Sequence, residues 1–182
     1  YKRGTTGKVT KVLEDAGLAY EVFCDIKSNP TIDNVKAGVE AFKATGADYI
    51  IAVGGGSPMD ASKAIALMIA NPEKKADFLY ETDAAVKQAA NKALMVAAVP
   101  TTAGTGSEVT PYAILTNHEK QTKKSIASPC LFPTYALLDA KYTKNLGLAT
   151  TVNTAIDSLS HSVEGMMSKR ANIMADVIAK EA

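Results

Sequence analysis

Residues 53–60, Val-Gly-Gly-Gly-Ser-Pro-Met-Asp, join an apolar segment to a helical pattern through three consecutive glycines. The apolar segment, residues 49–53, is continuous, as expected of a strand buried on both faces of a parallel sheet. Ser57 is suited to cap the following helix, Pro58 to its first position and Asp60 to its third. Such a turn lets the backbone approach a ligand and directs helix N–H groups at an anion. The motif predicts a phosphate-binding loop; a tight turn without a ligand is the alternative.

A second loop of related composition follows the next strongly apolar segment. Residues 99–108, Val-Pro-Thr-Thr-Ala-Gly-Thr-Gly-Ser-Glu, contain hydroxyl groups that can donate to a ribose, an amide or a phosphate. Taken alone they are typical of an ordinary polar loop. Because ligands of parallel sheets bind at the carboxyl ends of the strands, we expect the two loops to meet at one edge. The pair therefore predicts a bound nucleotide.

Helical and extended patterns alternate along most of the chain. Helices are expected over residues 8–16, 32–45 and 58–70, with glycines at 17 and 46 ending the first two. Strands are expected over residues 20–24, 49–53, 93–99 and 135–138, and a hairpin over 113–116 and 124–127. Residues 72–91 predict a polar, partly helical connection, and from residue 152 onward the pattern stays helical.

This order predicts an α/β fold with a Rossmann-like, mostly parallel sheet joined by right-handed crossovers, followed by the start of an all-helical domain. We place the boundary near Leu148, which gives an α/β domain over residues 1–148 and a helical segment over 149–182. The second part is shorter than the about 40 residues that a domain usually needs to hold itself together. We therefore expect it to be incomplete.

Composition and charge exclude several classes of protein. With 47% hydrophobic and 21% charged residues, the chain is typical of a globular protein and not of a disordered or coiled-coil one. Lys+Arg 20 and Asp+Glu 19 are dispersed, so neither a nucleic acid nor a membrane is an expected partner. No apolar run reaches about 18 residues, which predicts a cytoplasmic protein without a spanning helix. Cys24 and Cys130 lie far apart and are expected to be buried or half-buried thiols.

Asp157 and His161 are four residues apart in a segment predicted to be helical, so both side chains project from one face. A carboxylate and an imidazole together suit Zn²⁺ or Fe²⁺. On spacing alone, a surface hydrogen bond between the two is the competing interpretation. A catalytic ion normally has three protein ligands, and the other histidine, His118, lies in the predicted hairpin turn. Histidines of this chain cannot complete the site.

Together these motifs resemble the iron-containing (group III) alcohol dehydrogenases, whose dehydroquinate-synthase-like fold also occurs in glycerol dehydrogenase. The resemblance is carried by residues 54–60 with Lys63, by residues 100–110, by residues 124–129 and by residues 157–165. It covers nearly the whole chain, which looks like the central portion of a protein about twice this length. Within the family, the sequence is similar to the lactaldehyde reductase and 1,2-propanediol dehydrogenase branch.

The resemblance implies that the α/β domain binds NAD or NADP and that metal and substrate lie between it and a helical domain. The cofactor-binding residues it implies are Asn29, Gly55, Gly56, Ser57, Asp60, Thr101, Thr102, Thr105 and Lys123. Asp60 is expected near the pyrophosphate, and for Lys123 ordinary hairpin surface is the alternative. The metal ligands it implies are Asp157 and His161, with Fe²⁺ as the expected metal and Zn²⁺ as the alternative.

The implied activity is metal-dependent hydride transfer between NAD(P) and a small primary alcohol or aldehyde of the lactaldehyde and propanediol type. One alternative is a non-catalytic nucleotide-binding or assembly fragment. Another is a glycerol dehydrogenase or a dehydroquinate-synthase-like enzyme of the same fold. By the resemblance, a first strand would precede Tyr1 and two further metal-ligand histidines would follow Ala182, so this chain alone is expected to be inactive. A homo-oligomer is also expected.

Overall fold

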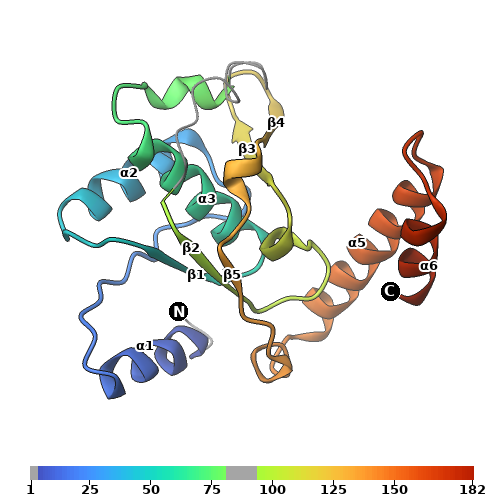
Figure 1. Ribbon diagram of the computed structural model, residues 1–182, viewed down its shortest axis with the longest axis horizontal. Helices are drawn as coiled ribbons and strands as arrows, with labels where there is room; N and C mark the ends of the chain where they lie inside the picture. Colours follow the sequence, from blue (N-terminus) through green and yellow to red (C-terminus); the bar gives the residue numbers. More distant parts are fainter. Residues whose placement is uncertain (1–3, 81–93) are drawn as a thin grey trace.

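A parallel sheet organises the α/β part of the protein (Figure 1). The computed structural model describes residues 4–80 and 94–182. Within these residues, strands β1 (Ile50–Gly54), β2 (Val96–Pro100) and β5 (Tyr135–Ala136) form a three-stranded parallel sheet in the order β1-β2-β5. The predicted α/β class with a parallel sheet is therefore confirmed. Both glycine-containing loops leave this sheet at the carboxyl ends of neighbouring strands, β1 and β2.

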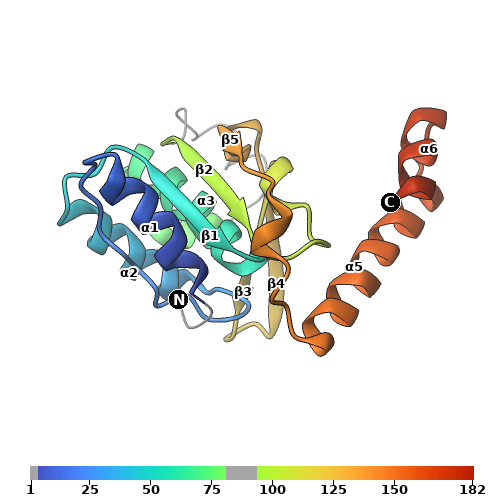
Figure 2. The ribbon, with the colours of Figure 1, turned by 90° about the horizontal axis from the view of Figure 1, so that it is seen from below.

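Helices lie on both sides of the sheet (Figure 2). Helix α3 (Gly56–Ala70) leads from β1 towards β2 and packs against both strands, and α2 (Ile32–Lys43) packs against α3. The main hydrophobic cluster joins these two helices to η1 (Ala76–Tyr80) and the hairpin described below. Helix α1 (Thr5–Asp15) lies on the opposite side of the sheet from α3, and none of its residues, all of them described, is buried.

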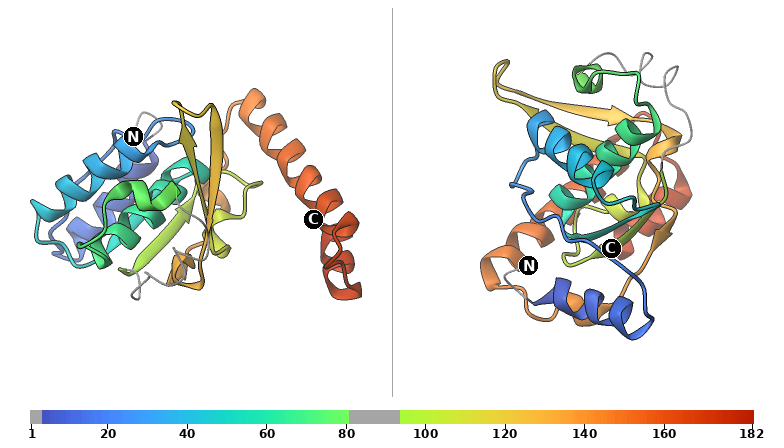
Figure 3. Two further views of the ribbon diagram at one scale, coloured as in Figure 1. Left: turned by 90° about the horizontal axis from the view of Figure 1, so that it is seen from above. Right: turned by 90° about the vertical axis from the view of Figure 1, so that its left-hand side faces the viewer.

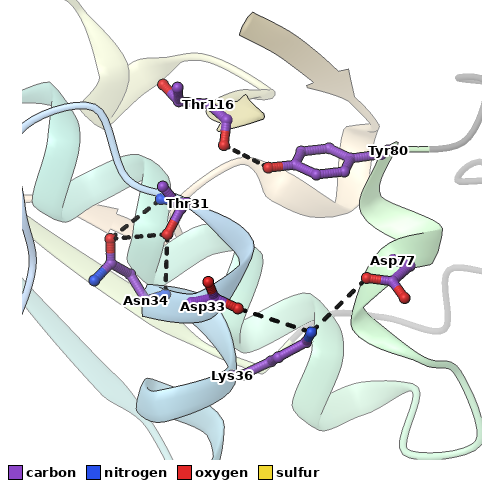
Figure 4. A network of polar contacts seen from close by, with 7 residues as sticks. All are labelled: Thr31, Asp33, Asn34, Lys36, Asp77, Tyr80 and Thr116. Carbon is purple, nitrogen blue, oxygen red and sulfur yellow. Dashed lines mark hydrogen bonds and ion pairs between the residues drawn. The ribbon is translucent and has the colours of Figure 1, made fainter. Parts of the chain in front are cut away.

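Local sequence explains how the first two helices end and begin. Gly17 adopts φ 69°, and the N–H groups of Leu18 and Gly17 donate to the carbonyl groups of Leu13 and Glu14 at 2.9 and 3.0 Å. This is the glycine-terminated helix end that the sequence predicted. Helix α2 begins with a reciprocal cap, because the Thr31 hydroxyl accepts from the Asn34 N–H while the Asn34 side chain accepts from the Thr31 N–H (Figure 4).

The predicted hairpin is confirmed as β3 (Tyr112–Asn117) and β4 (Thr122–Ala127), paired antiparallel. Two of the bonds that fix it to the rest of the fold are made by Thr116, whose N–H donates to the Pro30 carbonyl at 2.8 Å and whose carbonyl accepts from the Tyr80 hydroxyl. Lys36 of α2 lies between Asp33 and Asp77, with its Nζ at 3.9 and 3.8 Å from their carboxylates. Figure 4 shows how these contacts join α2, η1 and β3.

Two helices stand away from the sheet at the end of the chain (Figure 3). After the short η2 (Ser107–Val109), η3 (Pro129–Leu131) and η4 (Ala140–Tyr142), helix α5 (Leu148–Met167) begins at the predicted boundary residue, and α6 (Ile173–Glu181) folds back on it. Neither helix buries any of its residues, all of which are described. The helical pattern predicted for this region is confirmed, whereas the division into two domains stays a prediction.

The structure differs from two expectations about the fold, the strand over residues 20–24 and the burial of Cys24. Residues 20–24 belong to neither sheet, because a strand forms only where a neighbouring strand meets its N–H and C=O groups, and in the described chain no strand does so here. Cys24 is consequently exposed instead of buried, while Cys130 is half-buried as expected. Of the connection predicted over 72–91, η1 supplies the helical part; residues 81–91, and residue 93 of the predicted strand, lie outside the described residues.

In the described part of the chain, every helix is too short or too polar to cross a membrane.

Candidate nucleotide and metal site

Helix α3 begins two residues earlier than the sequence predicted. Gly55 is its N-cap and Gly56 its first residue, so Ser57 and Pro58 occupy the second and third helical positions. The cap prediction was wrong because the Ser57 hydroxyl is used elsewhere: it accepts from the backbone N–H of Asn29 at 3.2 Å. Since Gly55 has no side chain, no side chain caps this 15-residue helix, and the N–H groups of its first turn stay available to an anion.

The two predicted loops do meet. We call residues 54–56 the first loop and residues 101–110 the second loop. The Thr101 N–H donates to the Gly54 carbonyl at 2.9 Å, which continues the register of β1 and β2. A Cβ placed on Gly55 would lie 3.1 Å from the Thr102 hydroxyl, and one on Gly56 would lie 3.0 Å from the Thr105 methyl group. The second loop thus approaches Gly55 and Gly56 so closely that a larger residue at either position would require a threonine side chain to shift.

A third segment joins the two loops at the same end of the sheet. Asn29, in the turn before α2, adopts φ 57° and contacts Ser57 as described above. Its side-chain carbonyl accepts from Nζ of Lys123, at 3.0 Å, on strand β4. Asn29 and Lys123 are exposed, and the bond joins residues 94 positions apart in the chain. The structure thus brings Lys123 to the edge of the candidate site, not to an isolated stretch of hairpin surface.

Beneath the second loop lies a buried polar cluster that the sequence analysis did not identify as such. The Ser107 hydroxyl donates to the Asp60 carboxylate at 2.6 Å and accepts from Nζ of Lys63 at 3.0 Å. The other oxygen of Asp60 accepts from the Ile114 N–H at 3.1 Å. Both carboxylate oxygens of Asp60 therefore bind groups of the protein itself. The available signal was the presence of Asp60 and Lys63, three apart, in a helix that carries no other charged residue.

Burial shifts the pKa values of both ionisable members of this cluster. Desolvation raises the pKa of Asp60, although the bonds from Ser107 and Ile114 and the charge of Lys63 oppose the shift. Desolvation lowers the pKa of Lys63 to about 8, against the opposing effect of Asp60 and Glu108.

Asp157 and His161 lie on one face of α5, as predicted. Oδ1 of Asp157 is 3.7 Å from Nε2 of His161, and Oε2 of Glu164 is 4.0 Å from Nδ1 of the same ring. Their side chains are partly open, with 43% of Asp157 and 57% of His161 exposed. In the part of the chain that the structure describes, no group of three or more His, Cys, Asp or Glu side chains could hold a metal ion. The donor types fit a divalent metal, but they supply two ligands of the three that a catalytic ion normally has.

Helix α5 touches the second loop close to this pair. A Cβ on Gly104 would lie 2.5 Å from the Thr154 carbonyl oxygen, three residues before Asp157 in the chain. The backbones of the loop and the helix are therefore in direct contact. His118, by contrast, is exposed in the hairpin turn, as predicted.

Comparison with known proteins decides the family. Residues 1–140 match the family model described as iron-containing alcohol dehydrogenase. The chain belongs to the iron-containing alcohol dehydrogenase family. It is 37% identical over 179 residues to lactaldehyde reductase of Escherichia coli strain K12, covering 96% of this chain and 45% of that protein.

Solved structures of the family agree. The iron-containing alcohol dehydrogenase of Thermotoga maritima superimposes with a TM-score of 0.88 at 38% identity, covering 99% of this chain and 48% of that one. Sulfoacetaldehyde reductase of Bifidobacterium kashiwanohense, whose structure is a complex with NAD⁺, gives 0.83 at 34% identity, covering 98% and 47%. The chain thus spans about half the length of these relatives.

The names of these relatives favour the alcohol dehydrogenase interpretation over the glycerol dehydrogenase and dehydroquinate-synthase alternatives. Membership in an iron-containing dehydrogenase family implies a metal and a nicotinamide dinucleotide. The glycine loops fit a dinucleotide, since a Cβ at Gly54 would lie 2.6 Å from Pro58 and the first loop leads into a helix without a side-chain cap. Asp157 and His161 fit part of a metal site, as described above.

Proposed function

We propose that the intact protein is a metal-dependent alcohol dehydrogenase that interconverts small primary alcohols and aldehydes with NAD or NADP. The carrying observation is that α5, which bears Asp157 and His161, touches the second loop at Gly104. Dinucleotide loops and metal donors are thereby joined through one contact. The relatives named above support substrates such as lactaldehyde and 1,2-propanediol.

In this proposal, three segments of the chain bind the dinucleotide. The N–H groups at the start of α3 face the pyrophosphate, where the helix dipole favours negative charge. The threonine hydroxyls of the second loop donate to the ribose, the phosphates or the amide, and Lys123 adds a positive charge beside Asn29. The contacting residues are Asn29, Gly55, Gly56, Ser57, Thr101, Thr102, Thr105 and Lys123. Asp60 does not contact the dinucleotide in this proposal; it binds the Ser107 hydroxyl and so supports the second loop.

The metal half of the proposal rests on two residues of α5. Asp157 and His161 would hold a divalent ion, with Fe²⁺ as the expected metal and Zn²⁺ as the alternative. When bound, such an ion acts as a Lewis acid towards an alcohol or carbonyl oxygen. The loops orient the dinucleotide so that its reacting ring and the substrate approach in one geometry, which is the main contribution a protein makes in cofactor chemistry.

The decisive experiment compares two histidine variants of the intact protein. Protein loaded with Fe²⁺ or Zn²⁺ under anaerobic conditions should oxidise NADH or NADPH with lactaldehyde as the acceptor. His161→Ala should abolish turnover, while NADH binding, followed by its fluorescence, stays within about twofold because the dinucleotide loops are untouched. His118→Ala is the matched control and should keep full activity, since His118 is exposed in the hairpin turn.

The contradicting outcomes are distinct. Near-normal turnover of metal-loaded His161→Ala would show that the ring is not a ligand. NADH binding by the wild-type protein without any alcohol or aldehyde turnover would instead support the non-catalytic nucleotide-binding alternative. The proposal also includes assembly into a homo-oligomer and a cytoplasmic location. Sedimentation of the purified protein measures its oligomeric state.

A further inference from the structure

Lys63 is one of the largest fully buried side chains in the described part of the chain. Only 1% of it is exposed, and its Nζ donates to Ser107 Oγ, Thr110 O and Tyr112 O at 3.0, 2.9 and 2.8 Å. All three N–H bonds of an ammonium group are therefore used, and each is directed at the second loop or at the first residue of β3. A buried ammonium is tolerated only where it is bonded in this way.

These contacts act on the loop that carries the threonines of the candidate site. The second loop begins at Thr101, bonded to the first loop, and ends at Thr110, bonded to Lys63. Between these ends, Thr102 and Thr105 lie against Gly55 and Gly56. Lys63 and Ser107 thus hold the far end of the loop against α3, the helix whose N-terminus belongs to the candidate nucleotide site.

We propose that Lys63 is a positioning residue for the dinucleotide, because its ammonium group fixes the second loop over the start of α3. The inference rests on the proposed nucleotide binding. Lys63 does not touch the ligand in this account. It acts through Ser107 and the carbonyl groups of the loop, and so it sets where the threonine hydroxyls stand before the ligand arrives.

The geometry gives this role a pH signature. A neutral amine has two N–H bonds, so deprotonation leaves one of the three acceptors without a donor. Because burial lowers the pKa of Lys63 to about 8, the loop should loosen as the pH rises through that value. The charged groups that face Lys63 are Asp60 from α3 and Glu108 from η2, and both favour the protonated form. Nucleotide affinity of the wild type should consequently be full below about pH 7 and fall towards pH 9.

The test measures NADH affinity by fluorescence titration of the intact protein between pH 6.5 and 9.5. Lys63→Met keeps the length of the side chain and removes the ammonium; its dissociation constant should rise by at least about tenfold at pH 7, without a step near pH 8. Ser107→Ala removes one of the three acceptors and should show a smaller rise. Lys43→Met, an exposed lysine of α2 paired with Glu40, is the matched control and should behave as the wild type.

The outcomes of this test distinguish a positioning role of Lys63 from a purely stabilising one. A Lys63→Met protein that melts at a lower temperature but binds NADH with wild-type affinity would reduce Lys63 to a stabilising residue and overturn the inference. If that variant does not fold, a wild-type profile that stays flat from pH 7 to 9, or an unchanged Ser107→Ala affinity, overturns it equally. A wild type that does not bind NADH or NADPH at any pH would instead defeat the proposed function itself, and the inference with it.

Discussion

At the residue scale, the absence of a side chain at Gly104 allows the second loop to touch helix α5. A Cβ there would meet the Thr154 carbonyl oxygen at 2.5 Å, and backbone on both sides cannot yield as a side chain end would. Gly104→Ala should therefore push α5 away from the second loop and lower kcat by about tenfold or more, because the displaced helix carries the metal donors. Steady-state kinetics of the intact, metal-loaded protein measure this.

The matched control for this prediction is Gly7→Ala. Gly7 lies in the exposed helix α1, where an added Cβ meets nothing within 4 Å. Alanine there should leave kcat unchanged and stabilise the helix by up to about 1 kcal/mol. If both glycine variants retain full turnover, the contact between the loop and α5 has no bearing on catalysis.

Thr31 illustrates how the start of an element can position a residue of the site. Its hydroxyl caps α2, and the turn before it carries Asn29 and Pro30, which contact α3 and the hairpin. Thr31→Ala should lower the free energy of unfolding by about 1 kcal/mol, the usual cost of losing a side-chain cap. Urea denaturation measures the change. Thr10→Ala, which changes a half-buried threonine within α1, is the control; an equal loss of stability in both variants would mean that the Thr31 cap contributes nothing beyond an ordinary threonine.

At the scale of elements, prediction succeeded where a pattern is decided locally. Strand β1, helix α3 and the hairpin follow from apolar runs, helical spacing and a polar turn, each readable within one segment. The strand predicted over residues 20–24 failed because pairing depends on a neighbour that a local pattern does not contain. The start of α3 was misplaced because the Ser57 hydroxyl binds the distant Asn29 instead of its own helix.

In the candidate site, too, local patterns could be predicted and long-range contacts could not. That both loops meet could be predicted, because parallel strands bring their carboxyl ends to one edge. The bond between Lys63 and Ser107 could not, since it joins residues 44 positions apart and depends on how the second loop folds back over α3. Residue types alone therefore indicated which segments gather, whereas the contacts that orient them required the fold.

For the whole molecule, the distribution of buried surface is uneven. The core of the described chain lies between α2, α3, the sheet and the hairpin, while α5 and α6 expose large apolar side chains such as Leu159 and Ile173, at 63% and 79%. Helices of this length are marginal in water unless an apolar face is packed. The two parts of the chain should therefore differ sharply in their ability to fold alone.

This difference can be measured on two separate polypeptides, residues 1–148 and residues 149–182. The first should melt cooperatively, because the main hydrophobic cluster lies within it and draws on no residue of α5 or α6. The second should show only partial helicity by circular dichroism at low concentration and no cooperative transition, since none of its described residues is buried. A sharp, concentration-independent melt of residues 149–182 would mean that α5 and α6 form an independent unit, and the boundary at Leu148 would then separate two complete folds.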